Sequence, residues 1–210
     1  MSEPQRALLI ACGALARELL AVIEASGWQH LAVQCLPADL HNRPERITEA
    51  VRQKIRAARA GGRFSRVFVA YGDCGTGGAL DRMLHEEGVE RIAGAHCYEF
   101  LAGSALFERL SDEEPGTFYL TDFLLRHFDR IVIRGLGIDR YPHLAAQYFG
   151  NYRRLVYLAQ QPSAERLSAA RAAARRLGLA FESRDTGLAP LARALAFVNR
   201  ETIQWANSSW

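Results

Sequence analysis

Short apolar runs alternate with helix-like segments along the first half of this chain, and this alternation restricts its fold more than any other feature. Four runs, at residues 7–12, 31–36, 66–71 and 90–94, have the length of buried strands. The segments between them show the apolar spacing of helices, and the connecting turns are short. We therefore expect an α/β fold: a doubly wound parallel sheet of the flavodoxin or Rossmann kind, with helices on both faces.

The second half of the chain shows the same pattern less regularly. Residues 114–120 have the composition of a strand, and residues 130–134 fit either a helix continuation or a strand. The last unit is clearer, with a strand at 154–159, a helix at 163–177 and a strand at 179–183. A second, smaller α/β half is therefore expected to pack against the first.

The length of 210 residues allows one large domain or two small lobes, and either buries an adequate core without disulfides. We expect a first half over residues 1–112 and a second half over residues 113–210, with one continuous domain as the alternative. The tail has the pattern of a helix that contains Trp205 and ends in Trp210. Aromatic residues in such a tail are expected to dock on the protein's own core or on a second subunit, which leaves a homo-oligomer open.

The composition is that of an ordinary folded protein. Hydrophobic residues make up 49% of the chain and charged residues 23%, which excludes global disorder. The net charge of +3 is small for this length, and no nucleic-acid partner is expected. We expect a cytoplasmic protein without a membrane partner, because no signal-peptide pattern and no apolar stretch of membrane-spanning length is present. In that reducing compartment the four cysteines are expected to remain thiols.

Three of the cysteines follow predicted strands. Cys12 ends the first apolar run, Cys74 follows the third, and Cys97 follows the fourth. The carboxyl ends of parallel strands meet at one edge of a sheet, and ligands bind there where the strand order reverses. We therefore expect the three thiols to converge at this edge, with His96 and Glu99 at the same rim.

Three thiols and an imidazole suit a soft or borderline metal ion. The predicted metal ligands are Cys12, Cys74, His96 and Cys97. Tetrahedral zinc is the first choice, and an iron–sulfur cluster held by the three cysteines, with one iron left for substrate, is the alternative. Each thiol taken alone is more ordinarily a small buried hydrophobe, and Cys35, which alternates with apolar residues, is assigned to the core in this way.

Other residues near the cysteines are candidates for contact with a small-molecule ligand. Glu99 and His41 are the candidate catalytic residues, Glu99 as a base or further metal ligand and His41 in the loop after the second strand. Glycine-rich turns at the ends of strands offer backbone N–H groups to an anionic ligand. The candidate cofactor-binding residues in such turns are Gly13, Gly75, Thr76 and Gly77.

A metal-free chemistry fits the same residues. Cys74 and Cys97, facing each other at strand ends, would act as base and acid in proton abstraction beside a carboxylate. Proteins of the aspartate/glutamate racemase type look like this, although their Cys-Asn-Thr motif is absent here.

Several stretches of the chain together resemble a bacterial and archaeal family, domain of unknown function 1638. The resembling stretches are residues 11–13, 40–44, 71–75, 96–99, 115–122 and 148–152. Members of the family are often encoded near corrinoid-dependent methyltransferases, so the resemblance implies a role in one-carbon or methylated-amine metabolism by association. The chain has no Asp-x-His-x-x-Gly motif and does not look like the corrinoid carrier itself.

Three functional hypotheses follow from these observations. In the first, the protein holds zinc or an iron–sulfur cluster and binds or acts on a small molecule at the carboxyl edge of its sheet. In the second, it is an accessory protein that carries a metal or cofactor to a partner in a corrinoid methyltransferase system. In the third, it is a metal-free, two-cysteine acid–base enzyme.

Overall fold

The structure, a computed structural model, describes residues 6–208, with side chains described to residue 199. Contacts divide the chain into two compact units. The first contains the chain up to Phe100 and again from Leu191 onward, and the second contains the residues between. The boundary predicted between residues 112 and 113 stays a prediction about independently folding domains.

A four-stranded parallel sheet forms the centre of the first unit, in the order β2-β1-β3-β4. Its strands are β1 (Ala7–Cys12), β2 (Leu31–Leu36), β3 (Arg66–Ala70) and β4 (Glu90–Arg91). All six residues of β1 are buried, because β1 is flanked by strands on both sides and covered by helices on both faces. Ala7 pairs with Leu31 on one side and with Arg66 on the other. The predicted doubly wound parallel sheet is confirmed.

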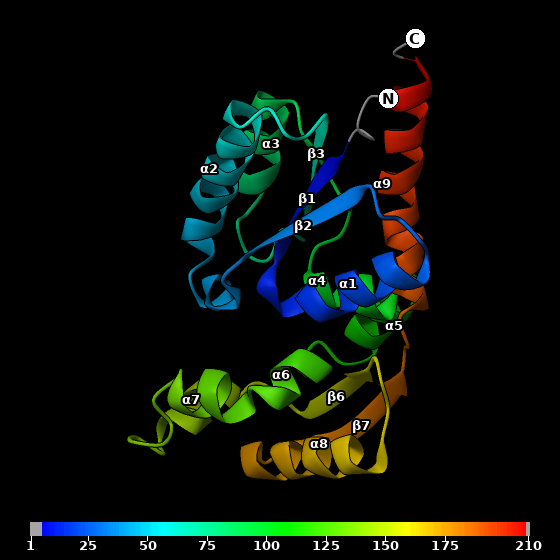
Figure 1. Cartoon of the computed structure of the whole chain (residues 1–210). Helices are drawn as coiled ribbons and strands as arrows, with labels where there is room; N and C mark the ends of the chain where they lie inside the picture. Colours follow the sequence, from blue (N-terminus) through cyan, green and yellow to red (C-terminus); the bar gives the residue numbers. More distant parts are fainter. Residues whose placement is uncertain (1–5, 209–210) are drawn as a thin grey trace. The chain divides into compact units, whose positions relative to one another are not determined.

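Helices cover both faces of this sheet. They are α1 (Ala16–Ala25), α2 (Ile47–Ala60), α3 (Ala79–Glu87) and α9 (Ala189–Ser208), and α4 (Cys97–Ala102) begins beyond the carboxyl edge. On one face α2 and α3 lie side by side, and Arg52 and Arg56 of α2 contact Glu86 and Glu87 of α3 at 3.0 and 2.9 Å (Figure 1). On the other face lie α1 and α9 (Figure 1). The side chains of Trp205 and Trp210 lie outside the described residues, so the docking of the tail stays a prediction.

The turns that join these elements differ from the sequence prediction in two places. The single helix predicted to reach Leu110 is two helices, α4 and α5 (Ser104–Glu113), because Gly103 between them has a φ of 81° that interrupts the helix. Cys35, assigned to the core from its sequence pattern, is exposed, and that assignment is wrong. It lies on β2, an edge strand whose side chains have a neighbouring strand on one side only. Three 3-10 turns complete the unit, at Gly13–Leu15, Ala38–Asn42 and Pro44–Arg46.

The second unit is a smaller α/β structure around a three-stranded parallel sheet in the order β5-β6-β7. Its strands are β5 (Thr117–Thr121), β6 (Arg154–Ala159) and β7 (Ala180–Asp185), and its other helices are α6 (Asp122–Arg126), α7 (Leu144–Phe149) and α8 (Ala164–Leu177). The central strand β6 packs Leu155 and Tyr157 into a core with Phe149 and the alanines of α8. Residues 129–134 form a π-helix, which resolves the choice between helix and strand in favour of a helix.

Candidate metal site

The three predicted thiols meet at the carboxyl edge of the first sheet. Cys12 is the last residue of β1, Cys74 lies in the turn after β3, and Cys97 is the first residue of α4. Their exposed fractions are 6, 6 and 7%, so all three are buried. The sulfur atoms of Cys74 and Cys97 are 3.4 Å apart, and Cys97 also shares a hydrogen bond with Cys12. We call these three residues the thiol cluster.

Two histidines lie beside the thiol cluster. His41, in the turn Ala38–Asn42, is exposed, and His96, directly before α4, is half-buried. Their rings are in edge contact with centroids 5.0 Å apart, and Tyr98 stacks on His96 at 4.2 Å. The ligand atoms of His41, Cys74 and His96 all lie within 4.8 Å of one another. These three side chains are close enough to hold one metal ion. The predicted binding of a metal by Cys12 and Cys97 stays a prediction.

The backbone brings Cys74 and His96 together through close contact of two loops. The Cys74 N–H donates to the carbonyl oxygen of Ala95 at 3.0 Å, and a Cβ atom on Gly72 would lie 2.6 Å from the Cα atom of His96. Cys74 itself has a φ of 48°, a left-handed conformation that is uncommon for residues other than glycine and recurs at functional sites. Glycine at position 72 therefore allows the loop of Cys74 to reach His96.

Asp73 organises the glycine-rich turn that follows β3. Its carboxylate accepts hydrogen bonds from the Thr76 hydroxyl at 2.5 Å and from the N–H groups of Gly78 and Gly77 at 2.8 and 3.1 Å. These bonds, that of Thr76 first, hold the pKa of Asp73 below its usual value. Because the Thr76 hydroxyl and the Gly77 N–H already donate within the turn, the binding of a ligand by Gly75, Thr76 and Gly77 stays a prediction.

Glu99 and Gly13 have local contacts that shape the same edge. The Glu99 carboxylate accepts a hydrogen bond from the Ala95 N–H at 2.9 Å, which holds the first turn of α4 against the loop that precedes it. A Cβ atom on Gly13 would lie 2.8 Å from the carbonyl oxygen of Leu36, so glycine is needed where the ends of β1 and β2 meet. The predicted catalytic role of Glu99 and cofactor contact of Gly13 stay predictions.

The thiols of the cluster have different acidities. Hydrogen bonds from Cys97 and His41 lower the pKa of Cys74 to about 4, against the opposing effect of burial. A hydrogen bond from Cys97 lowers the pKa of Cys12 to about 7. The pKa of Cys97 is raised well above its usual value, because its proton is shared with Cys12 and Cys74 and its side chain is buried. At neutral pH Cys74 is therefore a thiolate that accepts a hydrogen bond from a protonated Cys97.

The two imidazoles are also shifted in opposite directions. The hydrogen bond with Cys74 raises the pKa of His41, whereas burial lowers the pKa of His96. His96 is therefore held neutral, which is the form that binds metal ions. The hydrogen bond between His41 and Cys74 favours the protonated imidazole beside the thiolate, and a metal ion bound by His41 would have to displace that proton.

Sequence reasoning placed His41 at this edge as a catalytic residue but did not group it with Cys74, and it missed Tyr71 and Tyr98. Tyr71 directly follows β3 and is 2% exposed. Both tyrosines lie within three residues of a cysteine or histidine that was predicted to bind metal, and this closeness in sequence could have identified them.

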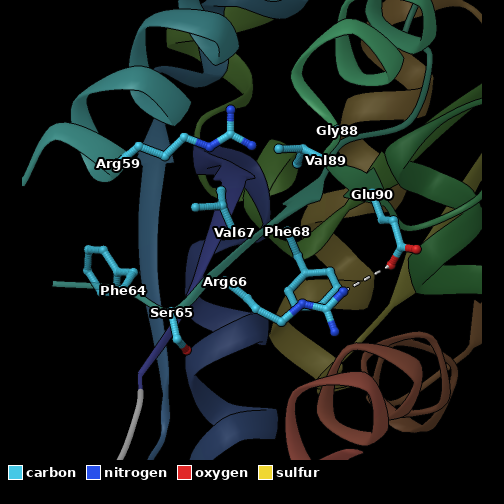
Figure 2. Close-up of a pocket in the computed structure, with 9 residues that line it drawn as sticks. All are labelled: Arg59, Phe64, Ser65, Arg66, Val67, Phe68, Gly88, Val89 and Glu90. Carbon is cyan, nitrogen blue, oxygen red and sulfur yellow. Dashed lines mark ion pairs between the residues drawn. The ribbon is translucent and has the colours of Figure 1, made fainter. Parts of the chain in front are cut away.

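A separate hollow of about 400 Å³ lies where β3 and β4 begin, at the edge of the first sheet opposite the thiol cluster (Figure 2). Arg59 on its rim pairs with Glu87 at 3.1 Å, and Arg66 lies 3.9 Å from Glu90 and over the ring of Phe68. Both arginines therefore have acidic partners. No cysteine or histidine is among the described residues that line the hollow, and the carboxylate of Glu90 in that lining lies beside Arg66.

A family model described as protein of unknown function (DUF1638) matches residues 35–195. The chain belongs to this family. The matched range of this DUF1638 protein contains His41, Cys74, His96 and Cys97, and Cys12 precedes it. The resemblance identified in the sequence is confirmed.

Neither the curated proteins nor the solved structures compared with this DUF1638 protein include a match. In the described part of the chain, no helix combines the length and apolar character needed to cross a bilayer. The cytoplasmic location stays a prediction. The function is therefore best argued from the chemistry of the site.

Proposed function

We propose that this DUF1638 protein binds a transition metal ion through His41, Cys74 and His96, and that it uses the ion to bind or act on a small molecule. The observation that carries the proposal is that the ligand atoms of these three side chains lie within 4.8 Å of one another. Two imidazoles and one thiolate are ligands that zinc prefers, so zinc is the first choice. The low pKa of Cys74, about 4, supports the proposal because the thiolate is the form that binds metals.

Three protein ligands leave a fourth position of a tetrahedral ion for a ligand. Cys97 is the nearest candidate for that position. Two thiolates on one zinc lie about 3.8 Å apart, given Zn–S distances of about 2.3 Å. The observed 3.4 Å between Cys74 and Cys97, and the raised pKa of Cys97, fit a hydrogen bond between thiol and thiolate better. The fourth position is therefore left to a small molecule, which the ion would polarise as a Lewis acid.

An iron–sulfur cluster is the alternative cofactor. The convergence of Cys12, Cys74 and Cys97 supports it, but it requires Cys97 as a thiolate, against its raised pKa. The exposure of His41 favours a related role, in which the metal is exchanged with a partner. A corrinoid methyltransferase system is the partner that the family association suggests.

A metal-free enzyme is the second candidate function. Such an enzyme needs an acid and a base. The Cys74 thiolate could act as the base and the Cys97 thiol as the acid, and their sulfur atoms are 3.4 Å apart. The imidazolium of His41 would hold Cys74 ionised. In that case Cys74 should be alkylated at neutral pH much faster than a free cysteine.

Metal analysis of protein purified without oxygen or chelators distinguishes these functions. We expect about one zinc per chain in the wild type and in Cys35→Ser, an exposed cysteine outside the cluster, and loss of the metal in Cys74→Ser. Iron with sulfide would select the cluster. Full metal retention in Cys74→Ser would contradict the proposed ligand set. Metal-free protein even after zinc addition would select the acid–base enzyme.

A further inference from the structure

A group of buried polar side chains lies at the carboxyl edge of the sheet in the second unit. Asp122 directly follows β5 and Gln160 directly follows β6, and each is 4% exposed. The Asp122 N–H donates to the side-chain oxygen of Gln160 at 3.0 Å, which joins the ends of the two strands. Open parallel sheets bind their ligands beyond the carboxyl ends of the strands, so this edge is where the second unit is expected to bind one.

The carboxylate of Asp122 holds an arginine at this edge. It accepts hydrogen bonds from the Tyr157 hydroxyl at 2.5 Å and from the Gln161 N–H at 3.0 Å. Its third neighbour is Arg166, in the first turn of α8, whose Nη1 lies 3.5 Å from the carboxylate. The same Nη1 donates to the carbonyl oxygen of Gln161. These contacts fix the direction of the Arg166 guanidinium group.

Arg166 uses its nitrogen atoms differently from two arginines that only hold the fold together. Arg91 and Arg154, whose side chains are 15 and 11% exposed, each engage Nε, Nη1 and Nη2 with oxygen atoms of the protein. Within the described residues, Arg166 engages Nη1 alone, and its side chain is 37% exposed. Its Nε and Nη2 remain open to a ligand. This edge of a guanidinium group matches two oxygen atoms of a carboxylate or phosphate.

A second arginine acts on the same group of side chains. Arg126, the last residue of α6, is exposed, and its side chain has no ion pair or hydrogen bond in the part of the chain that the structure describes. Burial first, and then Asp122, raise the pKa of Tyr157, and the positive charges of Arg166 and Arg126 oppose this shift. Both arginines therefore lie close enough to Tyr157 to act on its hydroxyl. Together they carry one positive charge more than Asp122 neutralises.

We propose that the carboxyl edge of the second sheet binds an oxyanion, the carboxylate or phosphate group of a small molecule, through Arg126 and Arg166. Asp122 holds the guanidinium group of Arg166, and the open edge of that group contacts the oxyanion. The proposal does not rest on the metal site, because all of its residues belong to the second unit. It adds a site whose ligand is recognised by its charge and by the geometry of two oxygen atoms.

The test follows the arginine Nε–H signals by NMR while inorganic phosphate or acetate is added at constant ionic strength. Arg176 is the internal control, since it also lies in α8 and pairs through Nη1 with an aspartate, Asp129, but both of these side chains are exposed. The signals of Arg126 and Arg166 should move and reach saturation with at least one of the anions, whereas that of Arg176 should not. A lower dissociation constant for phosphate would indicate a phosphorylated ligand, and a lower one for acetate a carboxylate.

Variants then test the two arginines separately. Arg126→Gln leaves the contacts of Asp122 intact, and its dissociation constant for the anion should rise about 10-fold because a charged donor is lost. Arg166→Lys keeps a positive charge beside Asp122 but lacks the paired N–H groups, so a similar rise is expected. Arg176→Gln should bind the anion as the wild type does.

Two results would overturn this inference. In one, the Nε–H signals of Arg126 and Arg166 move no further than that of Arg176 with either anion. In the other, Arg126→Gln and folded Arg166→Lys bind the anion with wild-type affinity. Neither result bears on the proposed metal site, which is tested with zinc and with variants of the first unit.

Discussion

The sulfur atoms of Cys74 and Cys97 lie 3.4 Å apart, and the pKa values of the two thiols are shifted in opposite directions. The proton of Cys97, which is shared with Cys12 and with Cys74, explains both shifts. Cys97 keeps the proton and donates it toward Cys74, so that Cys74 is the ionised member at neutral pH. This division of roles gives the site one metal-ready thiolate and leads to the predictions below.

The first prediction concerns the stability of the metal-free protein as a function of pH. The pKa of Cys74 is about 4 in the folded protein and 9.0 in the reference state. Between these values the unfolded chain binds more protons, so this residue's contribution to the free energy of unfolding rises with pH from about 4 to 9. Conversely, this contribution to the free energy of unfolding is lost as the pH falls toward and through the pKa of Cys74 in the folded protein. Urea unfolding across this range should show a weaker pH dependence for Cys74→Ala than for Cys35→Ala.

The second prediction concerns Cys97, which donates the hydrogen bond to Cys74. Cys97→Ala removes the largest cause of the low pKa of Cys74, so the pKa of Cys74 should rise. The rate of alkylation of Cys74, followed by mass spectrometry as the pH is lowered, should then decline at a higher pH than in the wild type. Cys97→Ser keeps an O–H donor, so its alkylation rate should decline at a pH between those of the wild type and Cys97→Ala. An unchanged pH profile in Cys97→Ala would show that Cys97 does not hold the thiolate.

The third prediction concerns the contact between Gly72 and His96. A methyl group at position 72 would lie 2.6 Å from the His96 Cα atom, so Gly72→Ala must displace the backbone of a proposed ligand. Overpacking of this kind costs about 1–3 kcal/mol of the free energy of unfolding, and zinc affinity should fall as well. Gly61→Ala is the control, since its methyl group would be 3.4 Å from the carbonyl oxygen of Ala57. Equal zinc affinity in the two variants would contradict the role assigned to Gly72.

The fold could be predicted where burial alone determines the pattern. The strands at 7–12 and 154–159 were predicted with the bounds of β1 and β6, because nearly every residue in them is buried between neighbours. The strand at 90–94 was predicted too long, since only Glu90 and Arg91 pair with β3. Cys35 was misassigned because an apolar pattern does not tell whether a strand lies at the edge of a sheet.

The sequence predicts where the site lies more readily than it predicts which side chains contact one another there. Parallel strands end at a common edge, and this rule alone brings Cys12, Cys74 and Cys97 together. The partnership of His41 with Cys74 depends on the path of the loop after β2, and the interaction of Tyr71 with Cys12 depends on the direction of one side chain. Neither loop path nor side-chain direction follows from the spacing of residues in the sequence.

The most direct test of the proposed site is an X-ray absorption spectrum at the zinc edge of the zinc-loaded protein. The proposed ligands predict one sulfur at about 2.3 Å and two imidazole nitrogens at about 2.0 Å from the zinc, with a further light atom in the fourth position. The imidazole signal should weaken in His41→Ala and in His96→Ala. A coordination shell of sulfur alone would show that the thiol cluster binds the ion, and a shell without sulfur would show that Cys74 is not a ligand. Either result would contradict the proposed site.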